Sequence, residues 1–415
     1  MFRAWVLCAV FAGTAIFAPP LRAGWAGDLE WKDAMREAAK ASEAGRWVEA
    51  EGLLRGAVKE AESSGQDQRR LAVSLTELGA VLYAVGRYAE AEKAYLRAAE
   101  ILDKALGPDH VQRADVLTRL AGLYIMQREY REAQVLLERS LDIRERALGL
   151  DHPDVAGSLN NLCTLYNFQG DIDKAETFCR KALQIQEKVY GRHHLNVADT
   201  LSNLGNLYVA KGNVAEAEQF LKRALMIREA ALGANHADVA ASLSNLAAFY
   251  NSVGKAAEAE QLLRRALGIQ ENYWGREHPE VANSLGSLGA LYMSQGKAKE
   301  ARPLVERALA ILERVFGPEH VRVGEMLSSL ASILETEGRL VDAEAAASRS
   351  VGILEKSRGQ KAPELPPALE SYAALLRKLG REPEARLVEE RAKAIRASGP
   401  MEKPNTSQPA STVLK

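Results

Sequence analysis

Residues 151–191 read DHPDVAGSLNNLCTLYNFQGDIDKAETFCRKALQIQEKVYG, and this stretch contains one complete structural unit of the chain. Its apolar residues, such as Leu162 and Tyr166, recur three or four positions apart, which is the spacing of one face of an α-helix. Gly170 ends this pattern, and a second run with helical spacing extends over residues 172–190. The stretch therefore predicts a hairpin of two helices, called helix A and helix B below.

The same unit repeats along the chain with a period of 42 residues. One glycine series follows each helix B: Gly107, Gly149, Gly191, Gly233, Gly275, Gly317 and Gly359. A second series follows helix A at Gly86, Gly170, Gly212, Gly254, Gly296, Gly338 and Gly380, with Arg128 in the one position where glycine is missing. Such a period predicts an all-α solenoid, and counting the units gives about nine helical hairpins.

Further residues keep the same register. Tyrosine recurs in helix A as Tyr124, Tyr166, Tyr208, Tyr250 and Tyr292, and alanine recurs in helix B as Ala91, Ala133, Ala175, Ala217, Ala259, Ala301, Ala343 and Ala385. This pattern resembles the tetratricopeptide repeat, and the 42-residue period with loops such as residues 148–153 resembles its kinesin light chain subfamily. The resemblance covers residues 31 to about 397 and implies a right-handed superhelix in which helix A lines a concave groove. It does not fix the function.

The two ends of the sequence differ from the repeats. Arg3 precedes an apolar run over residues 4–18 that is too short to span a bilayer, so residues 1–26 are predicted to be a secretory signal peptide cleaved after Ala26. Residues 27–397 form the repeat solenoid, and residues 398–415 are predicted to be a disordered tail. We therefore expect an exported protein, periplasmic or secreted, without stable membrane insertion after cleavage.

Charge excludes one class of partner. The chain has 54 Lys plus Arg and 55 Asp plus Glu, a net charge of -1, so nothing in its composition favours nucleic acid. A basic series in helix B runs from Arg97 to Arg391, but acidic residues recur six positions after its members, which indicates a balanced, solvated face.

Asparagine is concentrated between residues 160 and 283. Because asparagine is a poor helix former, its occurrence in helix A asks for an explanation. In tetratricopeptide proteins such asparagines bind peptide backbone, so the resemblance implies a peptide-binding groove at Asn160, Asn161, Asn203, Asn206, Asn245 and Asn251. Hydrogen bonding between neighbouring helices explains them equally well, and both can hold at once. The carboxylate-clamp slots carry no Lys or Arg, and Asp115, Asp199 and Glu325 predict a neutral to mildly acidic groove.

Two cysteines, Cys163 and Cys179, remain after signal removal and lie on the two helices of one hairpin. An exported compartment would permit a disulfide between them. Alternatively both are small buried fillers, as glycine, alanine and leucine fill these slots in other repeats. We slightly favour the fillers, because a disulfide requires α-carbons within about 7 Å.

No catalytic motif, cofactor motif or metal-ligand spacing stands out. Histidine recurs at the repeat period from His110 to His320, which predicts a hydrogen bond near the start of each helix A rather than a metal site. The leading hypothesis is a non-enzymatic scaffold that binds an extended peptide or protein segment. One alternative is an accessory subunit of an envelope machine for polymer export or cell-wall assembly. Another is an enzyme with a loop-assembled site, for which His193 and His194 are the sole indication.

Overall fold

The computed structural model describes residues 29–64, 68–360, 362 and 365–397, and within these ranges it contains eighteen helices and no strand. The predicted signal segment, residues 1–26, and the predicted tail, residues 398–415, lie outside the described residues. Eighteen helices are the number that nine hairpins require, so the all-α prediction is confirmed.

The helices alternate between the two classes that the sequence predicts. The A helices are α2 (Leu29–Glu43), α4 (Gln68–Ala84), α6 (Val111–Met126), α8 (Pro153–Gln169), α10 (Leu195–Ala210), α12 (Ala237–Ser252), α14 (Pro279–Ser294), α16 (Val321–Thr336) and α18 (Leu365–Lys378). The B helices are α3 (Trp47–Ser64), α5 (Tyr88–Leu106), α7 (Tyr130–Leu148), α9 (Ile172–Tyr190), α11 (Val214–Leu232), α13 (Ala256–Trp274), α15 (Ala298–Phe316), α17 (Leu340–Arg358) and α19 (Glu382–Ala397).

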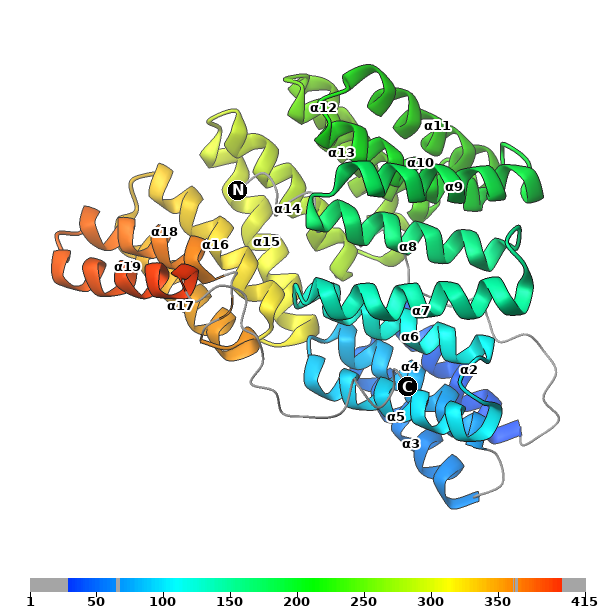
Figure 1. The fold of residues 1–415 in the computed structure, drawn as a ribbon. Helices are drawn as coiled ribbons and strands as arrows, with labels where there is room; N and C mark the ends of the chain where they lie inside the picture. Colours follow the sequence, from blue (N-terminus) through cyan, green and yellow to red (C-terminus); the bar gives the residue numbers. More distant parts are fainter. Residues whose placement is uncertain (1–28, 65–67, 361, 363–364, 398–415) are drawn as a thin grey trace. The chain divides into compact units, whose positions relative to one another are not determined.

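The chain divides into two compact units between α12 and α13. In unit 1, which runs to Lys255, each helix from α2 to α11 packs against the next one, and the series ends at α12 (Figure 1). In unit 2, which starts at Ala256, α13 packs against α14 and the stacking continues to α19. Neighbouring A helices also touch within unit 1, as α8 and α12 both do with α10.

The turn between helices A and B is built as the glycine series predicts. Gly170 has a φ of 81° and ends α8 in the left-handed conformation, which costs glycine no side-chain clash. The Asp171 carboxylate then accepts a hydrogen bond from the Lys174 amide at 3.3 Å and caps α9. Arg128 adopts the same conformation with a φ of 59°, the one positive value of a non-glycine residue in the described ranges.

In several hairpins a glycine on helix A faces a larger residue on helix B. A Cβ atom added to Gly205 would lie 2.6 Å from Leu221 Cγ, and one added to Gly79 would lie 2.6 Å from Tyr95 Cε1. Such distances are shorter than van der Waals contact, so the two helices approach closely because the A-helix residue is small. The recurrent leucine-small pair in the sequence therefore has a packing cause.

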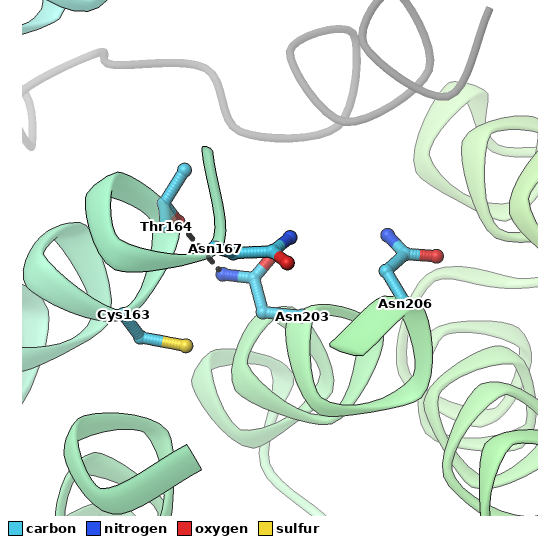
Figure 2. A pocket seen from close by; sticks show the side chains of 5 residues that line it. All are labelled: Cys163, Thr164, Asn167, Asn203 and Asn206. Atoms are coloured by element: carbon cyan, nitrogen blue, oxygen red, sulfur yellow. Dashed lines mark hydrogen bonds between the residues drawn. The ribbon is translucent and has the colours of Figure 1, made fainter. Parts of the chain in front are cut away.

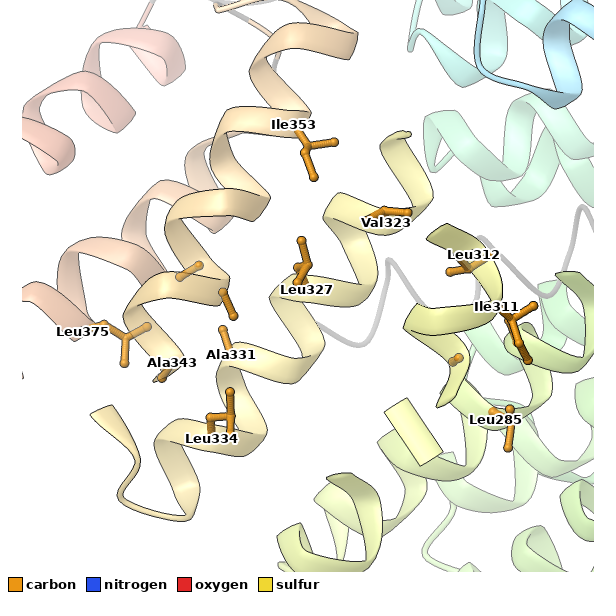
Figure 3. Packing of buried hydrophobic residues seen from close by; sticks show 14 of the residues in the cluster. Leu285, Ile311, Leu312, Val323, Leu327, Ala331, Leu334, Ala343, Ile353 and Leu375 are labelled. Carbon is orange, nitrogen blue, oxygen red and sulfur yellow. The ribbon is translucent and has the colours of Figure 1, made fainter. Parts of the chain in front are cut away.

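The apolar core runs through each stack rather than forming one centre. In unit 2 a single cluster of buried side chains extends from α14 to α18 and includes Leu285, Ile311, Leu327, Ile353 and Leu375 (Figure 3). Each hairpin thus buries its apolar face against its neighbours, which is the requirement that makes a repeat stack stable. Among the helices described, none is long and apolar enough to cross a membrane.

Candidate functional site

The asparagines predicted to bind a partner lie on three successive A helices of unit 1. Asn161 in α8, Asn203 in α10 and Asn245 in α12 occupy equivalent positions, one repeat apart. Asn203 and Asn245 are 8% and 6% exposed, and Asn161 is half-buried. The preceding A helix carries Arg119 at this position, where its guanidinium pairs with Glu77 at 3.0 Å. The residue at this position is therefore charged in α6 and uncharged in α8, α10 and α12.

One asparagine pair joins two A helices. Asn203 Nδ2 donates to Asn160 Oδ1 at 3.0 Å and lies 3.5 Å from Thr164 Oγ1, so α10 is bonded to α8 through their side chains. This contact is the interhelical hydrogen bond that the sequence left open as an alternative. It accounts for Asn160 and for the amide nitrogen of Asn203.

The other predicted asparagines are arranged differently. Within the part of the chain that the structure describes, the side chains of Asn161, Asn206 and Asn245 make no hydrogen bond. Asn251 lies near the end of α12, where its backbone carbonyl accepts from the Gly254 amide at 3.2 Å. The amides of the first three residues therefore keep their hydrogen-bonding capacity for a partner.

A shallow pocket lies between α8 and α10. It is lined by Cys163, Thr164, Asn167, Asn203 and Asn206, and it is open to solvent (Figure 2). Figure 2 shows Asn167 and Asn206 projecting beyond the Asn203–Thr164 contact, each from its own helix. Asn167 was not among the predicted site residues, although it lies one helical turn after Thr164 in the sequence and belongs to the same asparagine-rich region.

Arginines neutralise the acidic residues that led to the prediction of a neutral to mildly acidic groove, so these residues fit the neutral end of that range. The carboxylate of Asp115 pairs with Arg144, and that of Asp199 pairs with Arg228. The Arg144 and Arg228 side chains are 10% and 5% exposed. In unit 2 the carboxylate of Glu325 pairs in the same manner with Arg358 at 2.6 Å. The equivalent asparagines Asn161, Asn203 and Asn245 on α8, α10 and α12 are themselves uncharged.

These buried arginines also anchor the next repeat. Arg144 Nη1 donates to Ser158 Oγ at 2.6 Å, and Arg228 contacts Ser242 in the same way. In the intervening repeat Gln186 replaces arginine and accepts from Thr200 Oγ1 at 2.7 Å. Charge-assisted hydrogen bonds of this kind compensate the cost of burying the guanidinium.

The slots that hold Lys or Arg in a carboxylate clamp are instead involved in packing. Thr118 Oγ1 lies 2.9 Å from Ser140 Oγ, and Ser328 Oγ lies 2.7 Å from Ser350 Oγ, so both join helix A to helix B. Ser202 and Ser244 donate to backbone carbonyls of their own helices at 3.0 Å. None of these slots offers a positive charge to a terminal carboxylate.

Cys163 and Cys179 are bonded in the structure, with sulfurs 2.05 Å and α-carbons 5.3 Å apart. Both are buried. The structure therefore contradicts the slight preference for two cysteines without a disulfide, whereas the predicted burial of both residues is confirmed. The pair occupies the positions at which Gly205 faces Leu221 in the following repeat, so a covalent bond replaces the small-large contact.

The recurring histidines cap the A helices, as predicted. In each of six repeats the imidazole Nδ1 accepts a hydrogen bond from the amide two residues later, at 3.1–3.2 Å: His110, His152, His194, His236, His278 and His320. Across the described ranges, no group of three His, Cys, Asp or Glu side chains is placed to hold a metal ion. His194 stacks on Tyr190 with ring centroids 4.4 Å apart, so it too has a structural explanation.

The basic series on helix B forms ion pairs with acidic residues of the preceding B helix or of the loop that follows it. Arg97 pairs with Glu62 at 2.7 Å, and Arg139 pairs with Asp109, in the loop before α6, at 2.6 Å. In unit 2 Arg307 pairs with Glu271 at 2.6 Å and Arg349 pairs with Glu313 at 2.7 Å. The face is balanced, as predicted, and these pairs link consecutive repeats.

The stacked hairpins and their 42-residue period define an α-solenoid built from helical repeats. The family model described as "Tetratricopeptide repeat" matches residues 70–146, 154–230, 200–272, 238–314 and 280–356. The chain therefore belongs to the tetratricopeptide repeat family. No curated protein matches the chain.

Several solved structures are similar to the chain. Kinesin light chain-like repeats from Podosopora anserina share 27% identity over 50% of this chain and 98% of theirs, with a TM-score of 0.43. BtubC from P. vanneervenii shares 26% identity over 56% of this chain and 93% of its own, with a TM-score of 0.45. A Rap protein complexed with Competence and Sporulation Factor shares 15% identity over 89% of this chain and 99% of its own, with a TM-score of 0.54.

Proposed function

We propose that the chain is a non-enzymatic protein-interaction scaffold that binds an extended polypeptide segment on the A-helix face of unit 1. The observation that carries this proposal is the row of uncharged amides on α8, α10 and α12, of which Asn161, Asn206 and Asn245 are unbonded within the described residues. An extended segment presents its backbone N–H and C=O groups at regular intervals, and carboxamides can pair with both.

The pairing of the acidic residues with arginines restricts the charge of the partner segment. Since arginines neutralise Asp115 and Asp199, the face offers no net charge to a strongly basic segment. The absence of Lys and Arg from the clamp slots removes the means of holding a terminal carboxylate. An uncharged, polar, internal segment is the partner that fits this face best.

Export is part of the proposal and rests on the sequence of residues 1–26 alone. Mass spectrometry of the protein from its native source would give the mature N-terminus. A mature chain beginning at Gly27 is expected, and a full-length chain that retains residues 1–26 would contradict export. The alternative of an accessory subunit in an envelope machine for polymer export or cell-wall assembly uses the same binding mechanism. It differs only in the identity of the partner.

A capture experiment with matched variants tests the binding face. The mature protein would be used as bait in extracts of its native source, beside Asn161→Ala/Asn245→Ala. Both residues lack internal hydrogen bonds in the described ranges, so their loss should reduce capture at least tenfold without lowering the melting temperature. Ser287→Ala, at the equivalent position of α14, is the control and should capture normally. Equal capture by all three proteins would contradict the proposal.

A further inference from the structure

The pocket between α8 and α10 is unlike the equivalent positions at other steps of the two stacks. Four of its lining residues are uncharged and polar: Thr164, Asn167, Asn203 and Asn206. The corresponding residues are Gly122, Ile125, Asn161 and Thr164 at the step from α6 to α8, and Asn206, Val209, Asn245 and Ala248 at the step from α10 to α12. In unit 2 the step from α14 to α16 has Ala290, Met293, Ser329 and Ser332. Repetition of the fold therefore does not explain the polar character of this pocket.

The pocket retains a defined set of hydrogen-bonding atoms. Asn203 Nδ2 is already committed to Asn160 Oδ1 at 3.0 Å, and the Thr164 hydroxyl donates to the Asn160 backbone carbonyl at 3.1 Å. The Asn203 side-chain oxygen remains available, together with the whole carboxamides of Asn167 and Asn206, which form no bond with any residue that the structure describes. The pocket thus combines donors and acceptors in comparable number.

Charge and size restrict what can enter. No ionisable side chain lines the pocket, so a carboxylate or ammonium group would lose water there without gaining a counter-charge. The pocket is shallow and open to solvent, so it can contact the polar end of one side chain at its mouth but cannot receive a folded surface. Cys163, which is bonded to Cys179, cannot donate a proton and contributes an apolar wall. A neutral group with both a donor and an acceptor fits these conditions.

We propose that this pocket binds the primary carboxamide of a glutamine or asparagine side chain in the partner segment. A carboxamide has two N–H donors and an acceptor oxygen, so it can pair with the Asn203 oxygen and with either free amide. This inference rests on the proposed function, because the carboxamide belongs to a side chain of the segment that the A-helix face is proposed to bind. It adds a sequence preference that backbone recognition alone does not provide.

Capped tripeptides test this pocket directly. The mature chain, with its asparagine side chains labelled with ¹⁵N, would be titrated with acetyl-Ala-Gln-Ala-N-methylamide and with the versions carrying Glu or Lys in the middle. The Gln peptide should shift the side-chain resonances of Asn167 and Asn206 at millimolar concentration. The Glu and Lys peptides should bind at least tenfold more weakly, because their charges would be desolvated.

The control variants come from the chain itself. Asn167→Val and Asn206→Ala introduce the residues that Val209 and Ala248 supply at equivalent positions, so the double variant should fold with an unchanged melting temperature. In this double variant, which lacks the Asn167 and Asn206 resonances, the Asn203 side-chain resonance should not respond to the Gln peptide, whereas in wild type and in Asn245→Ala, outside the pocket, it should respond. Equal binding of the Gln and Glu peptides, a response that survives in the double variant, or no response to any peptide would overturn the inference. The capture experiment on Asn161 and Asn245 is scored separately, so the proposed function can stand when the carboxamide pocket fails.

Discussion

The Tyr208 hydroxyl in α10 donates to the Glu176 carboxylate in α9 at 2.6 Å and so bonds one repeat to the preceding one. The same contact recurs between Tyr250 and Glu218 at 2.8 Å, and in unit 2 between Tyr292 and Glu260 at 2.7 Å. The hydroxyl group of the recurrent tyrosine of helix A therefore links successive repeats.

Glu176 should make stability depend on acid pH. Burial raises the pKa of its carboxyl, but hydrogen bonds from Lys211, Tyr208 and Arg180 outweigh burial and lower the pKa from 4.5 to about 2. The stabilisation is therefore complete above the unfolded-state pKa and is lost as the pH falls from about 4.5 toward 2. Glu176→Gln should lower the free energy of unfolding by roughly 1.5 kcal/mol at pH 7.

Denaturant unfolding of wild type and Glu176→Gln at a series of pH values would measure this difference. The gap between the two proteins should be constant above pH 5 and narrow below it. Glu132→Gln, on the exposed first turn of α7, is a control that should behave as wild type at each pH. A gap that persists unchanged at pH 2.5 would show that the carboxylate is not the stabilising group.

Removing the disulfide should destabilise the hairpin of α8 and α9. Its cysteines are 16 residues apart, and closing a loop of this length is worth roughly 3 kcal/mol in the chain-entropy model. Cys163→Ser/Cys179→Ser should lose this amount, and more because two hydroxyls become buried. Cys163→Ala/Cys179→Leu should lose less, since Ala121 and Leu137 occupy these positions in the preceding repeat. Free thiols in the natively purified protein, detected by alkylation and mass spectrometry, would contradict the bond.

Arg128 provides a reciprocal test of the turn between helices A and B. Its left-handed backbone costs roughly 1 kcal/mol that glycine would not incur, although glycine adds entropy to the unfolded chain. Arg128→Gly should therefore leave the melting temperature unchanged or raise it. The opposite change, Gly212→Arg at the equivalent turn of α10, should lower stability by about 1–2 kcal/mol, because Gly212 has a φ of 74° and open space around it. A marked loss of stability in Arg128→Gly would show that the arginine side chain matters more than its backbone.

Substitutions of His152 and His193 distinguish a histidine with a structural role from one that could have a catalytic role. His152 Nδ1 accepts from the Asp154 amide at 3.1 Å, so His152→Ala should cost roughly 1 kcal/mol, whereas His152→Asn should retain the cap. His193 is exposed and caps no helix, so His193→Ala should leave thermal unfolding unchanged. Equal melting temperatures for His152→Ala and wild type would mean that the cap contributes nothing. The enzyme alternative would instead need an activity that His193→Ala abolishes.

The repeat register could be predicted from sequence because each hairpin is specified locally. Glycines at the turns, histidine before helix A and small residues opposite large ones are all visible within a single 42-residue period. The pairing of Asp115 with Arg144 could not be read in this way, because the two residues lie on different helices and meet only after the hairpin packs. A signal did exist, since Asp199 and Arg228 repeat both residues two periods later. The pocket at Asn167 was missed for the same reason, since its lining residues come from two successive A helices.

The three equivalent asparagines should respond differently to replacement by alanine. Asn203→Ala leaves Asn160 Oδ1 without its donor, and its own site is 8% exposed, so it should cost about 1–2 kcal/mol. Asn161→Ala and Asn245→Ala remove no hydrogen bond within the described residues and improve helix propensity, so both should be neutral or slightly stabilising. If the A-helix face holds a partner, the two neutral variants should lose capture of that partner while Asn203→Ala loses both stability and capture. Melting temperatures and capture yields measured on the three single variants separate these effects. If Asn161→Ala and Asn245→Ala capture the partner fully and only the unstable Asn203→Ala loses capture, these asparagines serve packing between helices and not partner binding.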